Sequence, residues 1–351
     1  MLPLHKKKRV QTPQRILLVR TDRIGDVVLT TPILKTLRIS FPKAHIGFLT
    51  TPFTEGLIKG NPYIDEIITL TKKDKTLWGS LRFASKLKER HFDIAIVFNP
   101  KKRTHWLLFL ARIPIRIGYH RKHGFLLTHS LPDLKYEGKQ SEAFYNEELL
   151  TVLNIFPSNS TQLYLPISSE TEQKIASFLK EHHLVSKSFA ILSISASSPS
   201  KSWPLNNFIA LCHEIHNELR LPIVIIGQDK ACQTMNRSLK IPVVFLGETL
   251  PLIELSALIR QATFMITNDT GPMHMASAVN TPLVAIFGRS LPGLGPKRWG
   301  PISDNAIVLH KNIGCDPCLA HRCQLEFDCL KAIKISEVMD AAKSLSPYSH
   351  H

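Results

Sequence analysis

The chain has 351 residues, of which 44% are hydrophobic and 21% charged, a composition typical of a soluble globular protein of about two domains. Apolar runs such as residues 283–288 are too short to span a bilayer, and residues 1–10 lack the apolar stretch of a secretory signal. We therefore expect a cytoplasmic protein. The net charge of +16 indicates an anionic partner: nucleic acid, an anionic membrane face or a phosphorylated substrate.

Short apolar strands alternate with amphipathic segments in the N-terminal half. The expected strands are residues 16–20, 45–50, 66–70, 92–98 and 115–119. Helical patterns cover residues 78–90 and 141–155, and residues 156–166, rich in Pro, Ser, Thr and Asn, are expected to form a linker.

Basic residues gather in this same half, at residues 5–9, 101–105 and 120–123. Each run taken alone is typical of solvated surface. Three runs in one half make a functional basic face the competing interpretation, and the two interpretations stay open at this point.

The second half repeats the alternation of strands and helices. Its expected strands are residues 189–194, 222–227, 242–247, 263–267 and 282–288. Its expected helices are residues 170–183, 205–219, 251–261, 271–280 and 335–345. Continuous Val, Ile and Leu strands separated by helices indicate parallel sheets covered on both faces. The predicted fold class is therefore α/β, with two doubly wound domains facing each other across a cleft.

Four of the six cysteines form a C-x2-C-x4-C-x5-C pattern, at Cys315, Cys318, Cys323 and Cys329. A disulfide framework is not expected in a cytoplasmic chain. Structural zinc sites usually bring two separated C-x2-C pairs, and only one such pair is present. We expect a loop of reduced thiols and no metal, with a thiolate zinc site as the alternative.

Neither G-x-G-x-x-G nor the phosphate-loop pattern occurs in the chain, although a nicotinamide enzyme or a phosphate-loop NTPase would be expected to show one. Two doubly wound domains without those loops suit an enzyme that binds a nucleotide-sugar in one domain and an acceptor in the other. That inference is an analogy between folds.

The polar turn Asn268-Asp269-Thr270-Gly271 separates an expected strand from an expected helix. Thr270 or Asp269 could cap the helix, whose free N–H groups and dipole would hold a diphosphate. Gly271 would allow close approach of the backbone, and His274 could add a donor to a phosphate or sugar. The alternative is that Asp269 only caps the helix and His274 lies on the surface.

A serine-rich loop follows the first strand of the second half. Ser197, Ser198 and Lys201 would offer hydroxyl donors and one ammonium to a pyrophosphate, with Lys201 neutralising the leaving group. The alternative is a flexible loop without a ligand.

Asp26 follows the first strand of the chain, in the turn Asp22-Arg23-Ile24-Gly25-Asp26. Pro32 fits the first position of a helix with Thr31 as its N-cap, which would leave Asp26 in the turn and facing the cleft. A sugar transferase that inverts the anomeric centre needs one base for the acceptor hydroxyl, and Asp26 could serve. The alternative is a helix-capping role.

Four segments together resemble the ADP-heptose:lipopolysaccharide heptosyltransferases of glycosyltransferase family 9, closest to the heptosyltransferase II branch. They are residues 18–34, 193–204, 268–288 and 314–333. The resemblance implies a GT-B fold of two Rossmann-like domains, metal-independent inverting transfer and no cofactor. It also implies an anionic glycolipid acceptor, the Kdo-containing inner core of lipopolysaccharide, met at the inner face of the cytoplasmic membrane.

The resemblance also implies residue roles. Asp26 corresponds to the proposed base, Lys201 to the diphosphate lysine, Asp269 to the aspartate near the donor sugar, Thr270 with Gly271 to the phosphate contacts, and His274 to the motif histidine. Candidates to meet the anionic acceptor are Arg20, Arg23, Lys101, Lys102, Arg103 and Arg121. We expect an acceptor-binding domain over residues 1–160, a donor-binding domain over residues 161–334, and a C-terminal helix and tail, residues 335–351, that pack back on the body.

The sequence also departs from the family pattern. The serine loop carries Ser195-Ala196-Ser197 where the family usually has Pro-Gly-Ala, and Ser202 where it has Arg. Ala231 stands where a glutamate often meets the donor ribose, with Asp229 nearby. These changes leave the donor's base and sugar open. The competing functions are a nucleotide-sugar epimerase and a nucleic-acid binder; we expect a monomer that binds no nucleic acid.

Overall fold

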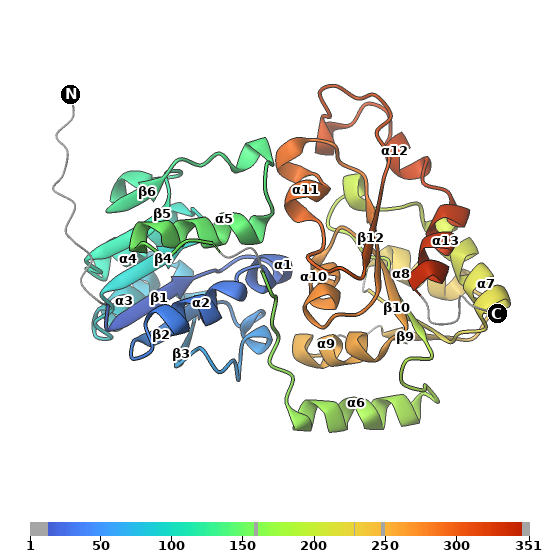
Figure 1. The fold of residues 1–351 in the computed structure, drawn as a ribbon, viewed down its shortest axis with the longest axis horizontal. Helices are drawn as coiled ribbons and strands as arrows, with labels where there is room; N and C mark the ends of the chain where they lie inside the picture. The colour runs from blue at the N-terminus through green and yellow to red at the C-terminus, as the bar shows by residue number, and fades with distance from the viewer. Residues whose placement is uncertain (1–12, 158–160, 228, 247–249, 346–351) are drawn as a thin grey trace.

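The computed structural model describes residues 13–157, 161–227, 229–246 and 250–345. Two six-stranded parallel sheets, each with helices on both faces, follow one another along the chain (Figure 1). Their strand orders are β3-β2-β1-β4-β5-β6 and β12-β11-β10-β7-β8-β9. The two orders have the same pattern, with the first strand of each half near the middle of its sheet. The α/β prediction with two doubly wound halves is confirmed.

The first sheet is built from short buried strands. They are β1 (Arg15–Val19), β2 (His45–Thr50), β3 (Glu66–Thr69), β4 (Ile94–Val97), β5 (Ile115–Tyr119) and β6 (His129–Leu131). Its helices are α1 (Ile24–Val28), α2 (Pro32–Ser40), α3 (Leu77–Lys88), α4 (Lys102–Leu110) and α5 (Glu142–Glu148).

Alternate residues of β1 separate the two faces of this sheet. Ile16 and Leu18 belong to a core shared with α2 and α5, whereas Leu17 and Val19 belong to a core under α3 and α4. This is the expected result of the two-residue period of a strand buried on both faces. The first of these cores continues into the second half of the molecule.

The second sheet repeats the plan. Its strands are β7 (Ala190–Ser193), β8 (Ile223–Ile226), β9 (Val243–Leu246), β10 (Phe264–Asn268), β11 (Leu283–Phe287) and β12 (Ala306–His310). Its helices are α6 (Ser169–Glu181), α7 (Leu205–Glu214), α8 (Lys230–Ser238), α9 (Leu252–Gln261), α10 (Gly271–Ala278), α11 (Pro296–Trp299), α12 (Asp328–Lys331) and α13 (Ile335–Leu345).

The C-terminal helix α13 lies against α7, β10 and β11. The division near residue 160 and the roles of the two halves stay proposals. Part of the expected linker, 158–160, and the tail 346–351 lie outside the described residues, as does the basic run 5–9.

Several elements were missed by the sequence analysis. Strands β6 and β12 are edge strands, and their residues are at most partly buried. Strand β6 is also short and contains His129 and Ser130, so it gives no continuous apolar run in the sequence. Helix α1 is one turn long, and α4 begins inside the basic run 101–105. Helix α8 carries few apolar residues.

One hydrophobic core joins the two halves. It contains Ile16 and Phe48 from the first sheet and Val224 and Met265 from the second. Contacts between α1 and α10 and between α9 and the short 3₁₀ turn Glu55–Leu57 carry it across the junction. In Figure 1, α1 and α10 lie side by side where the two halves meet.

Candidate active site at the domain junction

The two motif turns identified in the sequence meet at the junction. A Cβ added at Gly25 in α1 would come within 2.5 Å of the Cδ2 atom of His274 in α10. A Cβ added at Gly271 would come within 2.8 Å of the Cβ atom of Ile24. Each motif glycine therefore admits a side chain of the other motif, and α1 and α10 can approach only because both positions lack a Cβ.

Asp26 lies at this junction, but not in a turn as the sequence analysis expected. It is the third residue of the one-turn helix α1, whose N-cap is Arg23. Helix α2 does begin at Pro32 after Thr31, as predicted, although the Thr31 hydroxyl donates to the Val28 carbonyl rather than capping α2. Asp26 does not serve as a helix cap, and its carboxylate is partly exposed.

Arg20 holds the carboxylate of Asp26. Its side chain is buried, and its guanidinium forms ion pairs with Asp22 at 3.0 Å, with Glu142 at 3.3 Å and with Asp26. Burial would lower the pKa of Arg20, but the three carboxylates raise it, so it stays a cation. Arg20 was a candidate for binding the anionic acceptor. In this structure its guanidinium is paired with protein carboxylates and is not exposed to solvent, where an acceptor would bind.

Glu142 is a buried member of the same network that the sequence analysis missed. It accepts from Lys135 Nζ at 2.8 Å and from Arg298 of the second half at 2.7 and 3.0 Å. Burial alone would raise the pKa of Glu142, but Lys135, Arg20 and Arg298 lower it to about 2. Glu142 therefore links the group that holds Asp26 to the opposite domain through Arg298.

The second half places two cations around one carboxylate. Asp269 is buried, and its Oδ2 atom lies 3.1 Å from Lys201 Nζ and also pairs with Arg289. Lys201 Nζ also donates to the backbone carbonyl of Asp269 at 3.0 Å. Burial lowers the pKa of Lys201, and Asp269 partly opposes this shift. Sequence reasoning found Lys201 and Asp269 but not Arg289.

The start of α10 lies in the same place. Thr270 is its N-cap, and the Thr270 side chain makes no capping hydrogen bond. The Thr270 hydroxyl instead lies 3.3 Å from that of Thr267. The first N–H groups of α10 are therefore not satisfied by that side chain, which is the arrangement that anions favour at a helix N-terminus.

His274 is buried, so the alternative that it lies on the surface is wrong. Burial lowers its pKa from 6.5 to about 4, which makes it neutral at pH 7, and its Nδ1 atom has no hydrogen-bond partner within the described structure. Buried polar atoms usually have a hydrogen-bond partner, so an unpaired one on a residue that interacts with both Asp26 and Asp269 suits a site that receives a polar ligand.

The serine loop contacts the cysteine segment. The hydroxyls of Ser198 and Ser200 lie 2.9 and 3.0 Å from His321 Nδ1, whereas Ser197 is exposed. The Cys329 thiol donates to the Gly288 carbonyl at 2.8 Å. No three His, Cys, Asp or Glu side chains among the described residues are placed to share a metal ion.

The basic candidates for acceptor binding are spread out. Lys101 Nζ donates to the Thr21 carbonyl at 3.1 Å, and its pKa is lowered by burial. Arg121 pairs with Asp133 at 3.4 Å. Arg23, Lys102 and Arg103 are exposed. Lys101 thus joins the basic run 101–105 to the segment that leads to Asp26.

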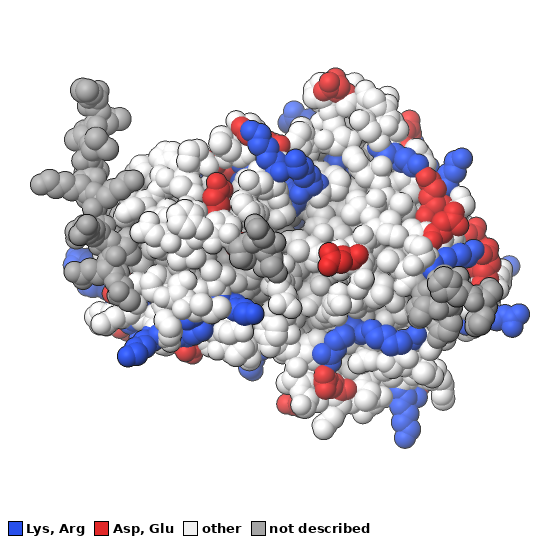
Figure 2. Space-filling model, in the orientation of Figure 1, with Lys and Arg blue, Asp and Glu red and all other residues white. Residues whose placement is uncertain are grey.

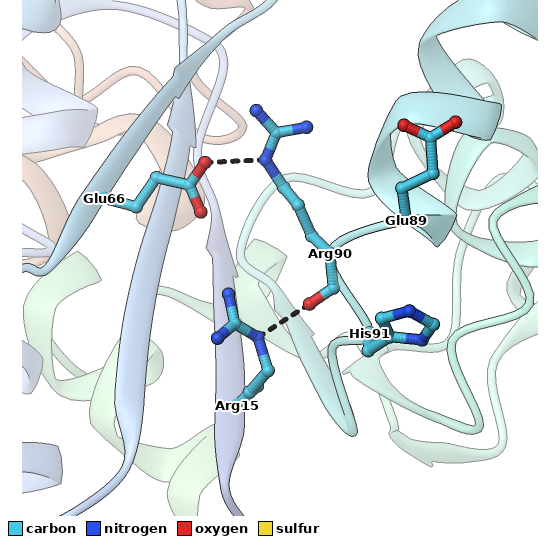
Figure 3. A pocket seen from close by; sticks show the side chains of 5 residues that line it. All are labelled: Arg15, Glu66, Glu89, Arg90 and His91. Carbon is cyan, nitrogen blue, oxygen red and sulfur yellow. Dashed lines mark hydrogen bonds and ion pairs between the residues drawn. The ribbon is translucent and has the colours of Figure 1, made fainter.

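A separate pocket lies away from the junction (Figure 3). It is lined by Arg15, Glu66, Glu89, Arg90 and His91, and an Arg90–Glu66 ion pair of 2.6 Å crosses it. Arg15 and Glu66 begin β1 and β3, so this pocket opens at the amino ends of the strands. Ligands of parallel α/β sheets bind beyond the carboxyl ends, where Asp26 and Asp269 lie, so we do not regard this pocket as the active site.

In the part of the chain that the structure covers, none of the helices has the length and apolar character needed to cross a bilayer.

The chain is similar to heptosyltransferases of known name. Over 302 residues it is 25% identical to lipopolysaccharide heptosyltransferase 3 of Escherichia coli, covering 81% of this chain and 85% of that one. Over 314 residues it is 24% identical to lipopolysaccharide heptosyltransferase 2 of Salmonella typhimurium, covering 84% and 87%.

Solved structures of similar proteins share the fold of this chain. A family 9 glycosyl transferase of Veillonella parvula is 25% identical, with a TM-score of 0.82 over 95% of this chain and 97% of that one. ADP-heptose lipopolysaccharide heptosyltransferase II of E. coli, 22% identical, shares the fold with a TM-score of 0.77 over 94% and 98%. The family model described as glycosyltransferase family 9 (heptosyltransferase) matches residues 80–327. The chain is therefore a member of glycosyltransferase family 9, with the GT-B fold.

Proposed function

We propose that this enzyme transfers heptose from ADP-heptose to the inner core of lipopolysaccharide, with inversion at the anomeric carbon. The observation that carries the proposal is the contact between α1 and α10, which sets His274 of one domain against Gly25 of the other and within electrostatic reach of both Asp26 and Asp269. The family membership and the names of the relatives support the heptose donor and the lipopolysaccharide acceptor.

The donor diphosphate would lie at the start of α10. The N–H groups of that helix, Lys201 and Arg289 together supply the positive charge that two phosphates require. Asp269 holds both cations in place. Thr270 and Gly271 would contact the phosphates, and Ser197 and Ser198 would flank them.

Asp26 would act as the base. Its carboxylate takes the proton of the acceptor hydroxyl, and the acceptor oxygen forms a bond to the anomeric carbon from the face opposite the diphosphate. The bond from that carbon to the diphosphate oxygen breaks, and Lys201 and the start of α10 stabilise the charge of the departing ADP. Neutral His274, which interacts electrostatically with both carboxylates, would donate a hydrogen bond to the sugar or accept one from it.

A related transferase with a different donor is the second candidate. The position that often carries a glutamate for the ribose is Ala231, and the nearby Asp229 accepts from the Cys232 N–H as the cap of α8. A neutral methyl group at Ala231 removes one ribose contact and favours a changed nucleotide. A nucleotide-sugar epimerase would differ from both candidates, since it forms product from the donor alone.

The proposal also includes a place of action. We expect the enzyme to work at the cytoplasmic face of the inner membrane, because the proposed acceptor is anchored in lipid. We also expect it to be a monomer.

The test is transfer to a deacylated, Kdo-containing acceptor read by mass spectrometry, with ADP-heptose, UDP-sugars and GDP-sugars offered separately. A heptose-sized mass gain with ADP-heptose alone is the expected result. A gain with another donor would keep the transferase and replace the donor. Product formed without an acceptor would identify an epimerase and overturn the proposal.

A further inference from the structure

Helices α3 and α4 form an outer layer of the N-terminal domain that exposes large apolar side chains. The two helices lie side by side over one face of the first sheet and share the core beneath them (Figure 1). The outer surfaces of these helices, together with the 3₁₀ turn Gly124–Leu126 that contacts α4, expose seven large hydrophobic residues. These are Leu77, Trp78, Leu81, Trp106, Phe109, Leu110 and Phe125, which we call the aromatic face.

The exposure is high and concentrated. Trp78 is 79% exposed, and Phe125 is 69% exposed. Four of the six exposed Trp and Phe side chains in the described part of the chain belong to this face. Single exposed hydrophobic residues are ordinary, but a group of them on one layer marks an interaction surface.

The rings of α4 and the following turn form a continuous cluster. The Trp106 ring lies 5.9 Å from that of Phe109 and 6.4 Å from that of His123, and the His123 ring lies 5.5 Å from that of Phe125. The Trp106 indole N–H donates to His123 Nδ1 at 3.0 Å. These contacts hold the cluster in place while its outer side stays open.

The same stretch of chain accounts for most of the net positive charge of the protein. Residues 71–126 contain 14 Lys and Arg but 3 Asp and Glu, so they supply +11 of the formal net charge of +16. On the view in Figure 2, by contrast, Lys and Arg lie scattered over both domains among acidic residues. Lys102, Arg103 and Lys122 are exposed beside the aromatic face and form no ion pair with any carboxylate in the described ranges.

We propose that the aromatic face and its flanking cations form the surface on which this enzyme docks to an anionic lipid bilayer. Trp and Phe side chains bind at the boundary between headgroups and acyl chains, and each Lys or Arg near an anionic leaflet adds attraction. Leu77, Leu81 and Leu110 have neither a polar group nor a ring for stacking on bases, so the composition of the face favours lipid over nucleic acid.

The location of this surface fits a lipid-anchored acceptor. Lys101, at the start of α4, donates to the carbonyl of Thr21, which begins the turn leading to Asp26. A bilayer held against α3 and α4 would therefore lie next to the side of the junction that carries the proposed base. This deepens the function proposed above, but the binding experiment below contains no donor sugar and can fail independently of it.

The test is cosedimentation of the full chain with phosphatidylcholine vesicles, with and without phosphatidylglycerol. We expect binding to the anionic vesicles that weakens with salt and falls about tenfold or more in a Trp78→Ser, Phe125→Ser double variant. The matched control is Phe156→Ser, Val185→Ser, which removes two similarly exposed apolar side chains elsewhere and should bind as the native chain does.

Two further measurements make the outcome decisive. Circular dichroism should show the same thermal transition for both double variants and the native chain, and both should keep native transfer to the deacylated acceptor. Native-like vesicle binding by the Trp78, Phe125 variant, or no binding by the native chain, would overturn the proposal. A different result would be that RNA displaces the native chain from the vesicles and fails to bind the Trp78, Phe125 variant. That result would overturn the proposal and assign the surface to nucleic acid.

Discussion

The two sides of the domain junction use charge in opposite ways. On the N-terminal side one guanidinium, Arg20, is surrounded by Asp22, Asp26 and Glu142. On the C-terminal side one carboxylate, Asp269, is surrounded by Lys201 and Arg289. The first arrangement has three carboxylates around one central cation, with Lys135 and Arg298 balancing Glu142 in turn, and the second has two cations around one central carboxylate.

This difference matches the two partners of a sugar transfer. On the first side Arg20 fixes the direction of the Asp26 carboxylate, which is what a base for an acceptor hydroxyl requires. An excess of cations at the start of α10 favours a diphosphate.

Removing the charge of Asp26 should have the greatest effect on turnover. Asp26→Asn is expected to lower kcat by roughly 10²- to 10⁴-fold, the range typical of a lost general base, while ADP binding stays near native. Initial rates and calorimetric titration with ADP measure the two quantities. Asp22→Asn is the matched control because Asp22 shares the same guanidinium. A larger loss in Asp22→Asn than in Asp26→Asn would move the base to Asp22.

Glu142→Gln should affect folding stability most, because it leaves Arg20, Lys135 and Arg298 without their shared carboxylate. Breaking a buried ion pair in this way typically costs about 3–5 kcal/mol, and urea unfolding at pH 7 would measure the loss. The folded-state pKa of about 2 lies below the ordinary 4.5, so this contribution is present above pH 4.5 and lost as the pH falls toward 2. Glu170→Gln, at an exposed pair with Lys174, should be silent. Equal stability of the two variants would refute the buried link between the domains.

Protonation of His274 should destabilise the fold in mild acid. Its pKa falls from 6.5 to about 4 on folding, so the unfolded chain binds the extra proton first, and stability declines as the pH drops from 6.5 to 4. The loss attributable to this residue is up to about 3 kcal/mol. Unfolding curves of the native and His274→Gln chains between pH 6.5 and 4 would isolate the contribution of His274 to the loss of stability, because the variant has no imidazole to take up the proton. Parallel curves for the two chains would contradict the buried neutral state.

Lys201→Met should weaken the donor site with a smaller effect. The loss of one hydrogen bond from a charged donor is worth about 1.5–3 kcal/mol, or roughly 10- to 100-fold in the Kd for ADP. Lys187→Met, a lysine of the same domain that bonds to backbone carbonyls, is the control. We expect the Lys187 variant to bind ADP as the native chain does. Unchanged ADP binding by Lys201→Met would remove Lys201 from the diphosphate site.

The sequence predicted the two sheets and located the two motif segments because both depend on local signals. Buried parallel strands are continuous apolar runs, and the Gly25-Asp26 and Asp269-Thr270-Gly271 motifs follow such runs directly. The contribution of Glu142 could not be found in this way. It lies in a helix with an ordinary pattern, and its partners Arg20 and Arg298 are 122 and 156 residues away in the chain.

The same limit applies to Asp26 itself. A one-turn helix leaves no periodic pattern, so α1 looked like a turn. Arg20 looked like one of many basic residues until the fold showed it to be buried among carboxylates. Burial and pairing over long chain separations are products of the tertiary structure, and a single sequence does not display them.

The hydrophobic core that runs from Ile16 in the first sheet to Met265 in the second has a thermodynamic consequence. The two halves are separate in topology, yet they share one apolar interior. A wide separation of the domains would expose part of that interior to water, at about 25 cal/mol for each Å² of apolar surface. We expect the chain to unfold in a single cooperative transition, with any opening that admits substrate kept small enough to leave this interior dry.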